Sequence, residues 1–173
     1  MLTDKVEGHA YDLFYRLLVS RWLLKQQPRV LEIGVQYGLS MDYWHSLMPN
    51  CHLTGIDVED LRIDKGLPHR MIVGDAYDAR TLNILSHTSY DLVVDDGPHT
   101  LSSMEFACQH YAPFTALGGA FVVEDIPDRD WVRQLVPLLP VTMQPNTFVV
   151  DMRSTPGTTG NDDILLVALR PLT

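Results

Sequence analysis

The sequence predicts an α/β fold, in which helices cover both faces of a seven-stranded and mostly parallel sheet. Two patterns carry this prediction. Apolar runs of strand length alternate with helix-length segments along the chain. The first five runs are nearly continuous in Val, Ile and Leu, as expected of parallel strands buried on both faces. With 173 residues, 46% of them hydrophobic, the chain suits one globular domain. We therefore expect residues 1–173 to form a single domain with a Rossmann-like architecture.

The predicted strands fall into two groups. Five alternate with helices, and two close the chain with only the polar loop Met152–Asp163 between them. Since no helix-length segment lies between these two strands, they are expected to form a terminal antiparallel hairpin. The predicted strands are Arg29–Ile33, His52–Asp57, Arg70–Val73, Tyr90–Asp95, Ala120–Glu124, Thr147–Asp151 and Ile164–Leu169.

A first helix, about Tyr11–Lys25, is expected before the first strand. Its apolar residues, among them Leu13 and Leu17, recur at helical spacing, so we expect most of that face in the core. The other predicted helices are Ser40–Met48, Asp78–Ser86, Leu101–Tyr111 and Asp130–Leu138.

The charge balance excludes several classes of partner. Lys and Arg number 13 against 22 Asp and Glu, a net charge of −9, and no basic run offers a phosphate-binding surface, so no nucleic-acid partner is expected. No apolar stretch approaches the roughly 20 residues of a membrane span, and the start of the chain lacks the apolar core of a signal peptide. We expect Cys51 and Cys108 to be free thiols and the protein to be cytoplasmic, with no membrane contact.

The segment from Val30 to Ser40 carries the first functional motif. An apolar strand ends near Glu32, and Gly34 and Gly38 follow in an E-x-G-x-x-x-G pattern. Glycines allow a sharp turn and a close ligand approach beside a helix N-terminus. The carboxylate would repel phosphate but suits an amino group or a cation, so the motif favours S-adenosylmethionine (SAM) over a dinucleotide. A plain tight turn is the alternative.

Two further acids follow strand ends and are candidates for the same cofactor. Asp57 lies 19 residues after Gly38, close to the spacing of about 20 for an acid that binds ribose hydroxyls. Asp75, with Tyr77 nearby, suits the adenine amino group. The alternatives are helix capping or a surface position for both acids.

Two acidic pairs then end the fourth and fifth strands. They are Asp95-Asp96 and Glu124-Asp125. Neighbouring strands would bring their ends about 5 Å apart, and carboxylates gathered there suit Mg²⁺, Mn²⁺ or Ca²⁺. We expect Asp96 to face the metal and Asp95 to turn toward the cofactor or the backbone, because successive strand residues point to opposite faces. Helix capping and water binding are the alternatives.

His99 lies three residues beyond Asp96. Its ordinary pKa is near neutral, so it is a candidate general base for a hydroxyl. The alternatives are a surface histidine or a metal ligand.

A family resemblance rests on a series of motifs in order along the chain: T-D-K from Thr3, G-H-A-Y from Gly8, Tyr15, the E-I-G-V loop, G-I-D, D-D-G-P-H and V-V-E-D-I. The chain resembles the metal-dependent sugar O-methyltransferases of macrolide biosynthesis and the group that includes cephalosporin hydroxylase. The resemblance implies the class I methyltransferase sheet, with strand order 3-2-1-4-5-7-6. It implies Mg²⁺, or another divalent cation, held by Asp96, Glu124 and Asp125, with His99 as base. It also implies that the segment around His9 and Tyr11 folds over the SAM pocket.

From these motifs we expect a SAM-dependent methyltransferase, with Asp96 and His99 as catalytic residues and a small-molecule or sugar hydroxyl as acceptor. The proposed cofactor contacts are Glu32, Gly34, Gly38, Ser40, Asp57, Asp75, Asp95, His9 and Tyr11. Two alternatives stay open: a SAM-binding interaction module without catalysis, and a metal-independent C- or N-methyltransferase. Compared with the macrolide enzymes, we expect the chain to lack an N-terminal domain and much of a segment after the fifth strand, which leaves the acceptor and a homo-oligomer open.

Overall fold

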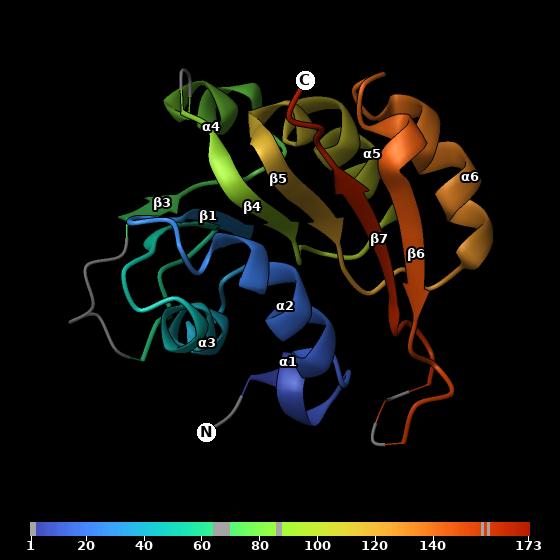
Figure 1. Ribbon diagram of the computed structural model, residues 1–173, viewed down its shortest axis with the longest axis horizontal. Coiled ribbons are helices and arrows are strands. Elements are labelled where there is room, and N and C mark those ends of the chain that lie inside the picture. Colours follow the sequence, from blue (N-terminus) through green and yellow to red (C-terminus); the bar gives the residue numbers. More distant parts are fainter. Residues whose placement is uncertain (1–2, 64–69, 86–87, 157, 159) are drawn as a thin grey trace.

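The computed structural model confirms the seven-stranded sheet and its strand order, β3-β2-β1-β4-β5-β7-β6 (Figure 1). It describes residues 3–63, 70–85, 88–156, 158 and 160–173. The first five strands, β1 to β5, pair in parallel, and β7 pairs antiparallel with both β5 and β6. The strands are β1 (Arg29–Ile33), β2 (His52–Asp57), β3 (Arg70–Val73), β4 (Tyr90–Asp95), β5 (Thr115–Val123), β6 (Thr147–Asp151) and β7 (Ile164–Leu169).

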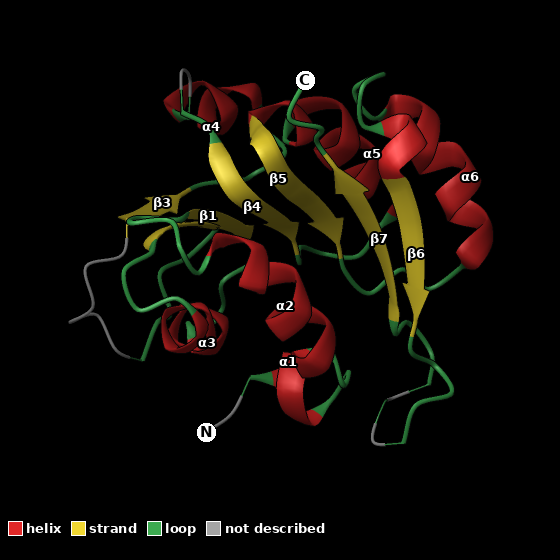
Figure 2. Cartoon of the chain, viewed as in Figure 1, coloured by secondary structure: helices red, strands yellow, loops and turns green. Residues whose placement is uncertain are grey.

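Helices lie on both faces of the sheet (Figure 2). Those near the N-terminus cover one face and those from the middle of the chain cover the other. The α-helices are α1 (Asp4–Glu7), α2 (Asp12–Val19), α3 (Leu39–Leu47), α4 (Ala79–Ile84), α5 (Leu101–His110) and α6 (Val132–Leu135). Short 3₁₀ turns are η1 (Ser20–Trp22), η2 (Ala112–Phe114), η3 (Arg129–Trp131), η4 (Val136–Leu138) and η5 (Gln144–Asn146).

The hydrophobic core is divided by the sheet into two clusters. Successive strand residues point to opposite faces, and β7 illustrates the result. Leu165 belongs to the cluster that contains Trp44 of α3, whereas Leu166 belongs to the cluster that contains Met104 of α5. Both leucines are fully buried. The continuous apolar strands of the sequence therefore arise because both faces are covered.

Two predicted helices are shorter in the structure. The helix expected to reach Lys25 ends at Val19 and continues only as η1. Leu13 and Leu17, expected in the core, are 66% and 65% exposed, because the buried stripe of α2 runs through Tyr15, Leu18 and Val19 instead.

The helix expected over Asp130–Leu138 is divided into η3, α6 and η4. Pro137 lies in the last of these turns and cannot continue an α-helical hydrogen-bond ladder. The expected end of the fourth helix, Ser86, lies outside the described residues.

The fifth strand begins five residues before its predicted start. Gly118 and Gly119 signal a turn in the sequence, yet both lie within β5. Gly118 adopts a φ of +76°, and the pairing of β4 with β5 changes register between Tyr90 and Leu92. A glycine inside a strand commonly marks such an irregularity.

The strand register brings the predicted functional segments together at the carboxyl edge of the sheet. Ile33 pairs with Asp95, and Asp95 pairs with Val123. The residues that follow these positions, Gly34, Asp96 and Glu124, therefore lie side by side.

Two further expectations concern the chain as a whole. In the described part of the chain, no helix has the length and apolar character that crossing a membrane requires. Cys51 and Cys108 are both free thiols, as expected.

Candidate active site at the carboxyl edge of the sheet

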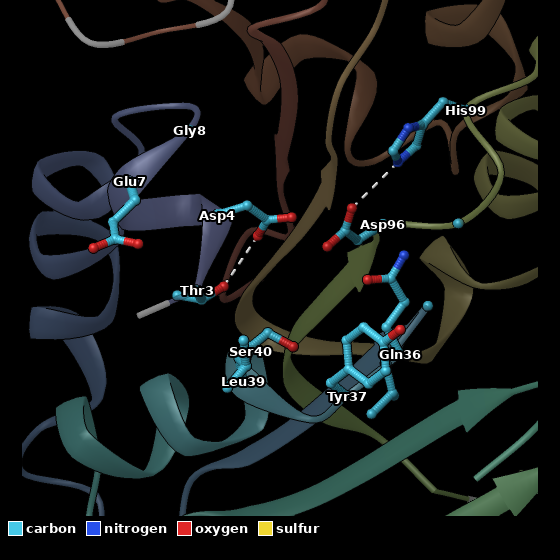
Figure 3. Close-up of a pocket in the computed structure, with 13 residues that line it drawn as sticks. Thr3, Asp4, Glu7, Gly8, Gln36, Tyr37, Leu39, Ser40, Asp96 and His99 are labelled. Carbon is cyan, nitrogen blue, oxygen red and sulfur yellow. Dashed lines mark hydrogen bonds and ion pairs between the residues drawn. The ribbon is translucent and has the colours of Figure 1, made fainter. Parts of the chain in front are cut away.

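Two adjoining cavities lie over the carboxyl ends of the central strands. The first, here the β2 cavity, has a volume of about 610 Å³ and is lined by Asp57, Asp75 and Tyr77 among others. The second, the α1 cavity, has a volume of about 540 Å³ and lies between α1 and the loop after β1 (Figure 3). Gly34 and Asp96 line both cavities. Together the cavities form a continuous site where open α/β sheets bind ligands.

The glycine loop after β1 is shaped by its contacts with the β4 loop. Gly34 has a φ of +82°, and a side chain there would overlap the carbonyl oxygen of Asp96. Gly38 also has a φ of +82° and precedes the first residue of α3. The two glycines therefore allow the sharp turn that the sequence predicted, and Gly34 lines both cavities. Ser40, the second residue of α3, lines the α1 cavity.

The predicted ribose and adenine acids both lie in the β2 cavity. Asp57 Oδ2 accepts hydrogen bonds of 2.8 Å from the backbone N–H groups of Val35 and Gln36. Its carboxylate thus holds the glycine loop and also lines the cavity. Asp75 accepts a hydrogen bond from the backbone N–H of Tyr77. The N-cap of α4 is Asp78, so Asp75 does not cap that helix.

Asp95 and Asp96 point to opposite sides of β4, as predicted. Asp95 accepts a 2.7 Å hydrogen bond from the hydroxyl of Tyr77, and burial raises the pKa of Asp95 to about 7. Asp95 lines neither cavity directly, since Tyr77 covers it. Asp96 faces the other way, toward Lys5 and His99.

Glu32 lies beneath the α1 cavity rather than in its wall. Its carboxylate accepts hydrogen bonds from the Ser40 hydroxyl at 2.7 Å and the Trp44 indole at 3.0 Å. The ammonium of Lys5 lies 3.6 Å away. The sequence motif predicted an amino group or a cation as the partner of Glu32, and in this structure that partner is the ammonium of Lys5.

Lys5 lies at the centre of a buried charge cluster. Its ammonium donates hydrogen bonds to Asp96 Oδ2 at 2.6 Å and to Glu124 Oε2 at 2.7 Å. Burial disfavours the charged form of Lys5, but Asp96, Glu124 and Glu32 outweigh that effect and raise its pKa well above the ordinary value. The raised pKa favours the charged form of Lys5, and the ammonium links α1 to the ends of β1, β4 and β5.

Three other side chains of the N-terminal segment bind the same edge. The Tyr11 hydroxyl donates a 2.6 Å hydrogen bond to Asp125 Oδ1, and the Tyr15 hydroxyl donates to Glu124 Oε1. His9 stacks on Tyr11 and lies 2.7 Å from Asp163. The segment thus borders the α1 cavity, and its folding over a SAM pocket stays a prediction. However, His9 and Tyr11 do not line either cavity; Thr3, Asp4, Glu7 and Gly8 do (Figure 3).

Asp96, His99 and Asp125 form a cluster that can hold a cation. Each offers one ligand atom, and these atoms lie within 4.8 Å of one another. His99 Nε2 is 3.2 Å from Asp96 Oδ1 and 3.8 Å from Asp125 Oδ2. Burial lowers the pKa of His99, but the hydrogen bond and charge of Asp96, together with Asp125, raise it overall. Glu124, the third predicted metal ligand, is not part of this cluster in the described chain, because both its oxygens bind the N-terminal segment.

Backbone strain marks the same edge of the molecule. Four non-glycine residues in the described chain have positive φ angles: Ala10, Gln36, His99 and Asp125. Each belongs to a segment that carries residues of the site. Such conformations cost on the order of 1–3 kcal/mol each and concentrate at functional sites.

Sequence reasoning assigned no role to Lys5 or Tyr15. Both were part of the motifs that carry the family resemblance, but a lysine in a first turn and a tyrosine in an amphipathic helix give no local sign of buried partners. Asp163, fully buried beside His9, was read only as the end of a loop.

The comparison with protein families decides the class of this site. The model of a methyltransferase domain matches residues 31–126, which include most of β1, all of β2 to β5, the glycine loop and both acidic pairs. The chain belongs to this methyltransferase family.

The chain is also similar to curated O-methyltransferases. The chain is 33% identical over 115 residues to mycinamicin VI 2''-O-methyltransferase of Micromonospora griseorubida, covering 61% of this chain and 29% of the relative. It is 29% identical over 115 residues, with the same coverage of both chains, to demethylmacrocin O-methyltransferase of Streptomyces fradiae.

A solved structure of the MycE methyltransferase from mycinamycin biosynthesis, in complex with Mg and SAH, has 30% identity and a TM-score of 0.60. That match covers 66% of this chain and 34% of MycE. The chain thus spans about a third of the length of MycE and of the two curated relatives.

Proposed function

We propose that the protein is a SAM-dependent O-methyltransferase that uses a divalent cation and methylates a hydroxyl of a small molecule or sugar. The observation that carries the proposal is one continuous site. A cavity with the predicted nucleoside-binding acids adjoins, through Gly34 and Asp96, a second cavity with His99 in its wall. The MycE structure, solved with Mg and SAH, supports the assignment of both ligands.

SAM would lie across the two cavities. The adenosine would occupy the β2 cavity, with its adenine near Asp75 and Tyr77 and its ribose at Asp57. The methionine part would extend past Gly34 into the α1 cavity, where Ser40 lies at the N-terminus of α3. The sulfonium would then lie near the Gly34–Asp96 junction, at which the methyl group faces the rest of the α1 cavity.

The acceptor would occupy that remaining part of the α1 cavity. The described lining includes Asp4, Glu7 and Asp96 but neither Lys nor Arg. Such a wall disfavours phosphorylated or carboxylated acceptors, because their charge would be repelled. A neutral polyol or an amino sugar fits this surface.

Asp96 and Asp125 would hold the divalent cation. Their oxygens Oδ1 and Oδ2, respectively, both lie near His99, and carboxylate oxygens are the ligands that Mg²⁺ and Mn²⁺ prefer. A bound divalent cation lowers the pKa of a hydroxyl that it contacts and fixes its direction.

His99 would take the proton from the acceptor hydroxyl. The hydroxyl oxygen forms a bond to the methyl carbon as the carbon–sulfur bond of SAM breaks, which releases S-adenosylhomocysteine (SAH). Asp96 orients the imidazole through their 3.2 Å contact. α1 would form one wall of this part of the site, through Asp4 and Glu7.

Calorimetry with SAH tests the cofactor assignment. We expect wild-type protein to bind SAH more tightly than NAD. The variant Asp57→Ala should lose roughly 1–3 kcal/mol of SAH binding free energy, because the ribose hydroxyls lose a charged acceptor. Asp151→Ala removes a surface ion pair with Arg153 and serves as the control, with unchanged binding. Tighter binding of NAD than of SAH would exclude the proposed function.

A further inference from the structure

The loop between β4 and α5 belongs to both cavities of the proposed site, and two adjacent residues divide between them. Pro98 lines the β2 cavity and not the α1 cavity, whereas His99 lines the α1 cavity and not the β2 cavity. The proposed nucleoside position and the proposed base are therefore joined by one peptide bond. Whatever fixes Pro98 also restricts where His99 can lie.

Both ends of this loop are fixed by the fold. At its start, the backbone N–H of Asp96 donates a 2.9 Å hydrogen bond to the carbonyl oxygen of Ile33 in β1. At its end, Thr100 caps α5, and its hydroxyl accepts a 3.2 Å hydrogen bond from the backbone N–H of Ser103. The conformation of the loop therefore depends on the residues between these two points.

His99 has a backbone conformation that needs support. Its φ is +53°, in the left-handed region that residues other than glycine seldom adopt. In that conformation its imidazole points to Asp96 (Figure 3). The preceding Pro98 has no backbone N–H, and its ring restricts its own φ to roughly −65°. The proline thus reduces the number of conformations that are open to His99.

The β2 cavity gives the proline ring a place to meet a ligand. Ile56, Val58 and Phe106 line the same cavity, and such an apolar lining suits the faces of an adenine ring. Pro98 itself is exposed. A nucleoside in the cavity would cover it, and burial of apolar surface contributes about 25 cal/mol per Å². Binding there would therefore hold the loop.

We propose that Pro98 is a positioning residue, which the adenosine of SAM covers and which thereby holds His99 in its left-handed conformation. The inference rests on the proposed function, because it concerns the same cofactor and the same base. It adds that the nucleoside alone, without the methionine part of SAM and without a metal, orders the base.

Nuclear magnetic resonance of the His99 imidazole, assigned with the variant His99→Gln, tests the inference without an acceptor. Adenosine is the probe, and EDTA keeps metal ions out of the measurement. At saturating adenosine we expect the His99 resonances of wild type to shift. In Pro98→Ala the shift should fall to less than half, because a flexible residue no longer transmits the binding of the nucleoside. Pro98→Gly, with still more backbone freedom, should lose more of it.

Pro113→Ala is the matched control. Pro113 is also exposed, is the middle residue of η2 and lines neither cavity, so its loss should leave the response of His99 unchanged. If Pro98 only stabilised the fold, Pro98→Ala would lower the free energy of unfolding in urea. The His99 shift at saturating adenosine would then equal that of wild type.

A second measurement needs no variant. Adenosine should reduce the fast motion of the His99 backbone amide in wild type, as measured by ¹⁵N relaxation. Unchanged motion would contradict the inference, even if Pro98→Ala did not fold.

Three outcomes of the imidazole experiment would overturn the inference. They are no His99 shift when adenosine is added to wild type, a shift in Pro98→Ala equal to that of wild type, and an equal loss of the shift in Pro113→Ala. SAH calorimetry on the same samples separates the two proposals. Binding of SAH with the wrong response of His99 refutes the role of Pro98, and failure to bind SAH refutes the proposed function.

Discussion

At the scale of single residues, the site combines side chains whose surroundings change their protonation. Glu32 is the clearest case. Burial raises its pKa from 4.5 to about 7, against the opposing effects of Lys5, Ser40 and Trp44. The pKa of His99 is raised as well, because the nearby carboxylates outweigh the effect of its burial.

The shift at Glu32 predicts a pH dependence of stability. Because the folded-state pKa exceeds the unfolded one, the native state binds more protons between about pH 4.5 and 7, and the free energy of unfolding falls as pH rises through that window. Glu32→Gln removes this titration. We therefore expect the stability of wild type relative to the variant to decline from pH 5 to 7, as measured by urea denaturation.

Asp151→Asn is the control for that experiment. The pKa of Asp151 is lowered by its hydrogen bond with Arg153, so its contribution is lost only in more acidic solution and should stay constant above pH 5. The prediction would be contradicted if the free energy of unfolding of wild type rose, relative to that of Glu32→Gln, between pH 5 and 7.

His99 is the residue on which the proposed chemistry depends most. His99→Ala should lower the single-turnover rate of methyl transfer on the order of 10²–10⁴-fold, the range of a general base. SAH affinity should change little. His52→Ala, at the exposed start of β2, is the control. If His99→Ala stays within about threefold of wild type, the base is another residue, and His9→Ala would test the nearest alternative.

At the scale of elements, the N-terminal segment is held to the sheet by buried polar contacts as well as by packing. Lys5, Tyr11 and Tyr15 each bind a carboxylate at the carboxyl edge. Since α1 forms part of the α1 cavity, these contacts determine the shape of the site as well as the stability of the segment.

Tyr15→Phe tests this anchoring. The substitution leaves a buried oxygen of Glu124 without its hydroxyl donor, so we expect a loss of roughly 1–3 kcal/mol of unfolding free energy. Amide hydrogen exchange over α1 and α2 should also increase. Tyr43→Phe, which removes a 3.1 Å contact with the partly exposed Asp12, should cost less. Equal effects of the two variants would mean that the Glu124 contact has no special weight.

At the scale of the whole molecule, the sheet joins two core clusters into what we propose is a single folding unit. Leu165 and Leu166 lie next to each other in β7, yet each is fully buried in a different cluster. Replacing either leucine by Ala should lower the free energy of unfolding by about 2–5 kcal/mol, because buried apolar atoms are lost and a cavity remains.

Calorimetry should show one transition for wild type and for both leucine variants, with the whole transition shifted to lower temperature each time. A control on the surface is available in Leu117→Ala, because Leu117 is 61% exposed. Two separate transitions, of which each variant moves only one, would contradict a single unit.

The sequence pattern by itself determined the strands, and their order followed from the family resemblance. Six of the seven predicted strands have the observed bounds. In the parallel part of the sheet the reason is that strands buried on both faces need short, nearly continuous apolar runs. The glycine loop and the acids at strand ends were also readable, since their meaning follows from their position along one strand. The ends of the helices were harder to predict. The early end of α2 and the break of the helix before Pro137 depend on local geometry and packing.

Only the tertiary structure decided how the acids are shared. The sequence grouped Asp96, Glu124 and Asp125 by their place after strands, but each carboxylate has two oxygens whose partners come from distant segments. Lys5 and Tyr15, 119 and 109 residues from Glu124, engage that residue, while Asp96 and Asp125 are directed toward His99. A charged group is buried only where it finds its counter-charge, and that pairing exists only once the chain has folded.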